Sequence, residues 1–122
     1  MSDVHVLGDG CAAMMLASRA GELNDQTLSI VCPEGAPPPR DHMLGFWATP
    51  DLEFAAQQAR HAWPNWSIIT EAGTAVLSSK SHPYHVMHKT HFLEHARAQA
   101  EEHGVRFIDQ AEHDNTGADT VF

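Results

Sequence analysis

The residues with the clearest chemical potential lie in the stretch VHVLGDGCAA, residues 4–13, where Gly8, Gly10 and Ala13 form a G-x-G-x-x-A pattern. Between a strand and a helix, this pattern binds the pyrophosphate of a dinucleotide. The first glycine permits the tight turn, the second lets the phosphate approach the backbone, and the small third residue lets the helix pack on the strand. The N–H groups and positive dipole end of the helix then face the phosphates. The predicted contacts come from Gly8, Gly10, Cys11, Ala12 and Ala13.

A turn with a purely structural role is the alternative interpretation, because small residues at such a turn also serve packing. The ribose of a dinucleotide is usually bound by an acid at the end of the second strand. Cys32 occupies that strand end, and Glu34 follows two residues later in the proline-rich loop PEGAPPPRD. Glu34 is therefore the candidate ribose ligand. Asp9 lies inside the turn, where its carboxylate would repel a pyrophosphate unless the side chain pointed away.

Five histidines fall within residues 82–95, and histidine is the commonest metal ligand. Only His91 and His95, four positions apart, would share a helical face as a two-ligand site requires. Glu94 or His88 could supply a third ligand. Solvated surface histidines are the favoured interpretation, so no metal ligand is predicted, and a small metal-linked binding module stays open as an alternative.

The elements that would position the glycine turn follow from hydrophobic patterning. Short apolar strands are expected at residues 3–7, 28–32 and 105–108, and a helix of small apolar residues follows the turn to Gly21. A right-handed crossover through that helix places the first two strands side by side and parallel. The predicted fold class is α/β: a partial Rossmann-type three-layer domain with a short parallel sheet.

The middle of the chain carries different patterns. A helix is expected from Thr49 to Trp63, an antiparallel meander over residues 66–88, and a helix from Thr90 to Gly104. By length the chain is one domain. Residues 1–109 are predicted to form an incomplete N-terminal dinucleotide-binding domain, and residues 110–122 a polar tail or the start of a further segment.

Composition excludes several classes of function. The chain has 122 residues and a formal charge of −9, with 16 acidic residues against 7 Lys and Arg. With so few Lys and Arg residues, the chain has no basic surface to bind the phosphates of a nucleic acid, which argues against nucleic-acid binding. No apolar run approaches the ~20 residues that span a bilayer, and no signal peptide is recognisable. Two cysteines without a C-x-x-C spacing are expected to be reduced thiols of a cytoplasmic protein.

Three blocks of sequence, in this order, resemble the lycopene cyclase family. They are DVHVLGDGCAAMMLA from Asp3, DHMLGFW from Asp41, and YHVMHKTHF from Tyr84. The second block is the most specific, because the glycine turn occurs in many flavoproteins. Within it, four residues agree with the family pattern and three depart from it; Asp41, His42, Phe46 and Trp47 agree, and Met43, Leu44 and Gly45 depart.

The resemblance implies an FAD cofactor in a Rossmann-type domain, with NAD as the alternative. It places His42 and Lys89 near the cofactor, and it implies redox-neutral cyclisation of a carotene end group by proton addition. Members of the family are considerably longer, and their proton-donating acids would lie beyond this chain. We therefore expect an N-terminal FAD-binding portion that is inactive alone.

The expected partners follow from this interpretation. They are a small-molecule dinucleotide, and a hydrophobic carotenoid only for the full-length enzyme. Peripheral membrane association of the full-length protein and self-association of the chain are open alternatives. So are two other functions: the FAD- or NAD-binding portion of another oxidoreductase, and a small non-enzymatic α/β binding module.

Overall fold

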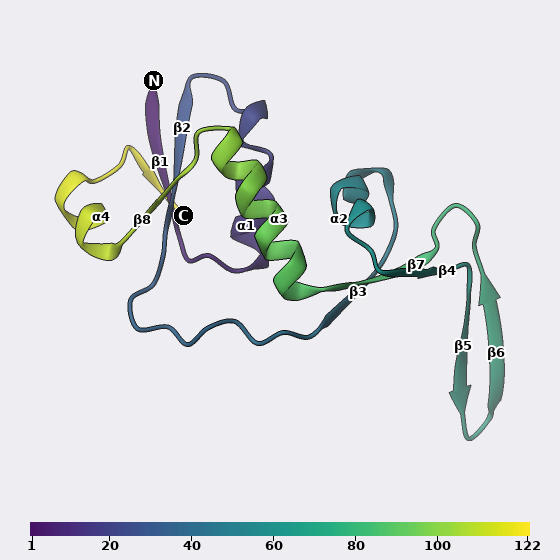
Figure 1. Ribbon diagram of the computed structural model, residues 1–122. Coiled ribbons are helices and arrows are strands. Elements are labelled where there is room, and N and C mark those ends of the chain that lie inside the picture. Colours follow the sequence, from purple (N-terminus) through teal and green to yellow (C-terminus); the bar gives the residue numbers. More distant parts are fainter. The chain divides into compact units, whose positions relative to one another are not determined.

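The computed structural model describes all 122 residues and divides into two compact units (Figure 1). The first, here called the sheet unit, comprises residues 1–39 and 93–122. The second, the insert unit, comprises residues 40–92. Length had indicated one domain, but the chain leaves the sheet unit after its second strand and returns to it within α3, so the intervening residues form a compact unit of their own.

The sheet unit is built on a four-stranded parallel sheet in the order β8-β2-β1-β9. The two central strands pair over six residues each, with Val4 opposite Leu28 and Val6 opposite Ile30. The parallel sheet predicted from the sequence is confirmed, and a fourth strand adds to it. The strands are β1 (Ser2–Leu7), β2 (Gln26–Val31), β8 (Arg106–Ile108) and β9 (Thr120–Val121).

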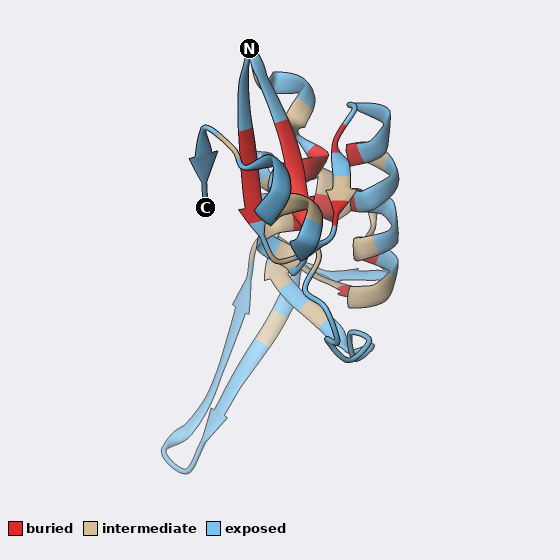
Figure 2. Ribbon diagram, turned by 90° about the vertical axis from the view of Figure 1, so that its left-hand side faces the viewer, coloured by how far each residue is buried: buried red, intermediate tan, exposed pale blue.

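Small side chains let helices pack closely against one face of this sheet. The buried core joins valines of β1 and aliphatic residues of β2 to Ala17 of α1 (Cys11–Ser18) and Ala100 of α3 (Lys89–Glu102) (Figure 2). Both alanines are fully buried. Burial of each of these aliphatic side chains stabilises the folded chain by roughly 1.5–3 kcal/mol. The core residues are Val4, Val6, Ala17, Leu28, Ile30, Ala100 and Val105.

The opposite face of the sheet is covered by α4 (Gln110–Thr116), which makes the three layers expected of this fold class. His5 alternates with Val4 and Val6 along β1 and therefore points to this face. It is only 5% exposed, and its Nδ1 lies 2.7 Å from Nδ1 of His113. The segment that the sequence left as a polar tail thus contains a helix and a strand, and the Phe122 amide donates to the His5 carbonyl (2.9 Å).

The insert unit has antiparallel strands, but they do not form a meander. Residues 65–78 make an isolated hairpin, whereas β7 pairs with β3 and β4 instead of with β6. The sequence pattern showed the strands and could not show their pairing. The elements are β3 (Met43–Trp47), η2 (Pro50–Leu52), α2 (Glu53–Gln57), β4 (His61–Trp63), β5 (Asn65–Thr70), β6 (Gly73–Ser78) and β7 (Tyr84–His88).

Two further expectations for this unit were wrong. The helix predicted from Thr49 to Trp63 ends at Gln57, because residues 61–63 pair with β7 as a strand. Backbone pairing and cross-strand contacts override helical periodicity there. The DHMLGFW block was not assigned a strand, yet its last five residues form β3. Gly45 in the middle of this segment weakens the strand signal.

The Tyr84 side chain on the neighbouring strand leaves no room for a side chain at Gly45. A Cβ at this position would overlap the hydroxyl and ring of Tyr84. We therefore predict that Gly45→Ala destabilises the insert unit by about 1–3 kcal/mol, because the Tyr84 ring must move. All three tryptophans lie in this unit, so urea unfolding followed by tryptophan fluorescence measures the effect. Gly10→Ala is the control, because a Cβ there meets no atom within 4 Å. Equal stability of the two variants would contradict the prediction.

Candidate functional site

The glycine turn connects the central strand β1 to α1 and leaves the start of the helix uncovered. Gly8 has φ +105°, a conformation that side chains disfavour, and its amide donates to the Val31 carbonyl (2.9 Å). Gly10 is the N-cap in extended conformation, without any side-chain capping bond. The first intrahelical bond runs from the Met14 amide to the Gly10 carbonyl (2.9 Å). The three preceding amides, of Cys11, Ala12 and Ala13, therefore have no acceptor within the helix.

The space above this turn is open. A Cβ on Gly8 or on Gly10 would meet no protein atom within 4 Å. Packing within the chain therefore does not explain the small residue at Gly10, which is the position where a pyrophosphate would approach. A groove of about 530 Å³ runs over the turn and is lined by all five residues predicted to make the backbone contacts. Its lining consists of Val6, Leu7, Gly8, Gly10, Cys11, Ala12, Ala13, Leu16 and Phe122.

The charge of Asp9 acts on the thiol of Cys32, which follows the end of β2. Burial raises the pKa of the Cys32 thiol, and the charge of Asp9 and hydrogen bonding to its carboxylate raise it further. Arg97 of α3 acts on the same thiol in the opposite direction and was not recognised from the sequence. Only the fold brings the charge of this residue within range of Cys32.

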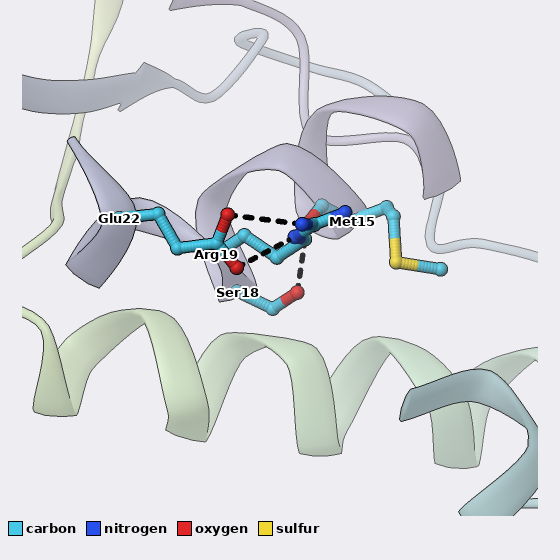
Figure 3. Close-up of polar contacts among 4 residues, drawn as sticks. All are labelled: Met15, Ser18, Arg19 and Glu22. Carbon is cyan, nitrogen blue, oxygen red and sulfur yellow. Dashed lines mark hydrogen bonds and ion pairs between the residues drawn. The ribbon is translucent and has the colours of Figure 1, made fainter. Parts of the chain in front are cut away.

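Polar contacts fix the other end of α1 (Figure 3). The Ser18 hydroxyl donates to the Met15 carbonyl (2.7 Å). Arg19 donates two hydrogen bonds to Glu22 of η1 (Ala20–Glu22), at 3.0 and 2.9 Å, and this pairing lowers the pKa of Glu22. The outer side of α1 stays apolar, with Leu16 45% exposed. The helix is thus held at its C-terminal end by its own residues, while its N-terminal end has no capping side chain.

The remaining predicted site residues do not join the turn. Glu34 is exposed in the loop that follows β2. His42 and Lys89 belong to the insert unit, where the Lys89 amide donates to the His42 carbonyl (2.9 Å). The structure therefore brings these two residues together and places them in a different unit from the glycine turn. Their role beside a cofactor stays a prediction.

The histidine cluster is spread over different environments. The ring of His85 stacks on Phe46 with the centroids 5.6 Å apart. His88 accepts a hydrogen bond at Nε2 from Arg60 (2.6 Å), and its Nδ1 lies 3.5 Å from Asp41. The structure holds no group of three or more histidine, cysteine or acidic side chains placed to bind a metal ion. It also has no helix with the length and apolar character needed to cross a membrane.

Comparison of the sequence with protein-family models and with curated proteins finds no match. Solved structures, in contrast, share the fold. A variant of 2-methyl-3-hydroxypyridine-5-carboxylic acid oxygenase is 16% identical and superposes with a TM-score of 0.65 over 89% of this chain and 31% of its own. PqsL of P. aeruginosa, in complex with 2-aminobenzoylacetate, is 12% identical with a TM-score of 0.63 over 88% and 33%.

A third solved structure, CtdE in complex with FAD and a substrate, is 13% identical with a TM-score of 0.55 over 89% of this chain and 30% of its own. This chain therefore spans about a third of the length of the solved proteins that it resembles. At these identities the likeness shows the fold: an α/β arrangement shared with one part of these longer proteins.

Asp41 provides a test of how the insert unit is held together. The Thr90 hydroxyl donates to it (2.9 Å) and lowers its pKa, helped by the Thr90 amide and by His88 and His42. A carboxyl group whose pKa is lower in the folded than in the unfolded chain stabilises the fold at pH values above its ordinary pKa of about 3.9. This stabilisation is lost as the pH falls through the lowered pKa of the folded chain.

We therefore predict that Asp41→Asn lowers the melting temperature at pH 7, and that its difference from wild type narrows as the pH falls below about 5. Circular dichroism melts at several pH values measure this. Glu71→Gln is the control, because it removes the same charge from the exposed hairpin turn. The difference in melting temperature between this variant and wild type should not depend on pH in the same way. If the difference in melting temperature between Asp41→Asn and wild type did not depend on pH, the stabilising role of the Asp41 carboxylate would be contradicted.

Proposed function

We propose that this chain is the FAD-binding portion of a flavin-dependent enzyme, in which the sheet unit binds the ADP half of the cofactor. The observation that carries the proposal is the uncovered helix start at Gly10. It follows a central parallel strand, has no capping side chain and has open space where a Cβ would point. The likeness in fold to CtdE, whose structure contains FAD, supports the identity of the ligand.

Backbone groups do the binding in this proposal. The amides of Cys11, Ala12 and Ala13 donate to the pyrophosphate oxygens, and the positive end of the α1 dipole favours the phosphate charge by about 0.3–1 kcal/mol. Gly8 holds the turn in its left-handed conformation, and Gly10 lets the phosphate reach the backbone. The flavin, when bound, supplies the redox or electrostatic chemistry of the reaction. Glu34, His42 and Lys89 remain proposed contacts at other parts of the cofactor.

Two activities are candidates for the longer enzyme. Oxygenation is favoured by the fold, because one of the similar solved proteins is an oxygenase. Carotene cyclisation, as in the lycopene cyclase family, is favoured by the second and third sequence blocks. Parts of these blocks pair as neighbouring strands, with Met43 opposite His88 and Trp47 opposite Tyr84, so residues 43–47 and 84–88 lie side by side in the insert unit.

The proposal predicts that FAD and ADP bind the chain with similar affinity and that FMN does not bind. The reason is that the described contacts reach the pyrophosphate and the adenosine side, and the flavin ring would stay in water. Titrations followed by amide chemical shifts measure this, and the shifts should centre on residues 8–13. Selective binding of FMN would reject the proposed orientation.

Gly10→Val should abolish binding of ADP and leave the fold nearly intact, because the valine side chain enters open space that the phosphate would need in this proposal. Ala75→Val adds similar bulk in the exposed hairpin and is the matched control. The same amide titration, with circular dichroism as the check on folding, compares the two variants. Retention of ADP by Gly10→Val would reject the turn as the phosphate site.

The chain alone is predicted to be catalytically silent. The described residues leave the flavin unprotected, and the acids that the family resemblance assigns to proton donation are absent from this chain. Incubation with lycopene and reduced FAD, followed by chromatography of the carotenes, should yield no cyclic product. Clear cyclisation, or a tightly bound flavin on the purified chain, would show that the chain is itself a compact enzyme.

A further inference from the structure

Two imidazole rings meet on the face of the sheet that α4 covers. Nδ1 of His5 on β1 lies 2.7 Å from Nδ1 of His113 on α4, and the ring centroids are 5.0 Å apart. His5 is 5% exposed, so little water reaches this contact. A hydrogen bond between two ring nitrogens needs one N–H and one lone pair, so one ring donates and the other accepts. A single hydrogen atom therefore lies between the two rings.

This geometry limits how many further protons the two rings can take up. One additional proton is compatible with the contact, because it turns the donating ring into an imidazolium and strengthens the bond. His113 is in the last turn of α4, where the helix dipole favours a positive charge. A second additional proton turns both facing nitrogens into N–H donors, because an imidazolium has no free lone pair. Two donors and two like charges then face each other with little water between them, so the contact must break.

The histidine contact helps to attach one segment of the chain to β1. This segment, residues 109–122, contains α4 and β9 and is called the α4–β9 segment below. Its backbone also bonds to β1: the Asp119 amide donates to the Asp3 carbonyl and the Phe122 amide to the His5 carbonyl, both at 2.9 Å. Phe122 lines the groove over the glycine turn as well. The attachment of the α4–β9 segment therefore determines one wall of that groove.

The elements around the two histidines also carry charged groups. Asp3 of β1 accepts a hydrogen bond from the Thr27 hydroxyl of β2, and Arg106 of β8 forms an ion pair with Glu112 of α4. Carboxylic acids ordinarily titrate near about pH 4 and histidines between about pH 5 and 8. A change of pH from 7.5 to 5.5 therefore tests protonation of histidine. The charged groups on these elements are Asp3, Arg106, Asp109, Glu112, Asp114 and Asp119.

We propose that the contact between His5 and His113 makes the attachment of the α4–β9 segment depend on pH. At neutral pH the two rings share one hydrogen and the segment stays on β1. In acid, the attached form holds at most one additional proton on these rings, whereas the separated form holds two. Separation is therefore favoured about tenfold for each pH unit below the ordinary histidine pKa of about 6.5. The groove then loses the wall that Phe122 provides, whichever ligand it binds.

Hydrogen exchange of the Asp119 and Phe122 amides measures separation of the segment, because each amide donates to a carbonyl of β1. After correction for the intrinsic exchange rate, their protection in wild type should fall about tenfold between pH 7.5 and 5.5. His113→Gln should abolish this dependence, because an amide side chain can donate or accept and so tolerates protonation of His5. His82→Gln is the control: it removes an exposed histidine of the insert unit and should keep the wild-type dependence.

Constant protection of the two amides in wild type would reject the proposal. An equal fall in wild type and His113→Gln would also reject it, because the titrating group would then lie elsewhere. A parallel fall at the Cys32 amide, which donates to the Ile108 carbonyl within the sheet, would show that the whole unit unfolds and that the segment does not separate by itself. Circular dichroism verifies folding, and His5→Gln, with the same expected loss of pH dependence, replaces His113→Gln if that variant does not fold.

Discussion

The parallel pairing of β1 with β2 is the constraint on which the rest of the sheet unit depends. Their register over six residues brings Leu7 level with Val31, so the chain must turn at Gly8 exactly where β2 also ends. The crossover through α1 then places the start of that helix at the edge of the sheet. The core reinforces this arrangement, because Ala17 and Ala100 allow α1 and α3 to pack directly on the valines of β1.

Local dipoles, and not net charge, determine what such a site can bind. The chain carries a formal charge of −9, yet the proposed ligand is an anion. No cationic side chain lines the groove over the turn, so attraction would come from backbone amides and the helix dipole. The amides and the dipole act within the first turn of the helix. The more distant surface charges are screened by ordinary salt beyond about 8–10 Å. The uncapped start of α1 therefore matters more for an anionic ligand than the total charge.

The insert unit presents a different situation. Its hairpin exposes apolar side chains on both faces: Ile69 and Val76, each about three-quarters exposed, lie on one face, and the exposed Ile68 lies on the other. A two-stranded hairpin is marginally stable by itself, and exposed apolar surface is typical of interaction sites. Self-association of the chain, which the sequence leaves open, is not tested by the structure, and the residues of this surface do not identify a partner.

The sequence by itself determined the strand–turn–helix unit, its parallel partner strand and the small residues of the glycine turn. These depend on local signals: runs of β-branched residues, glycines at fixed spacing and the right-handed crossover. Tertiary structure alone decided which strands of residues 43–88 pair, why the helix after Thr49 stops at Gln57, and that Thr120 and Val121 join β1. It also decided that His5 of β1 lies beside His113 of α4. Such contacts join residues far apart in the chain, and neither composition nor periodicity carries information about them.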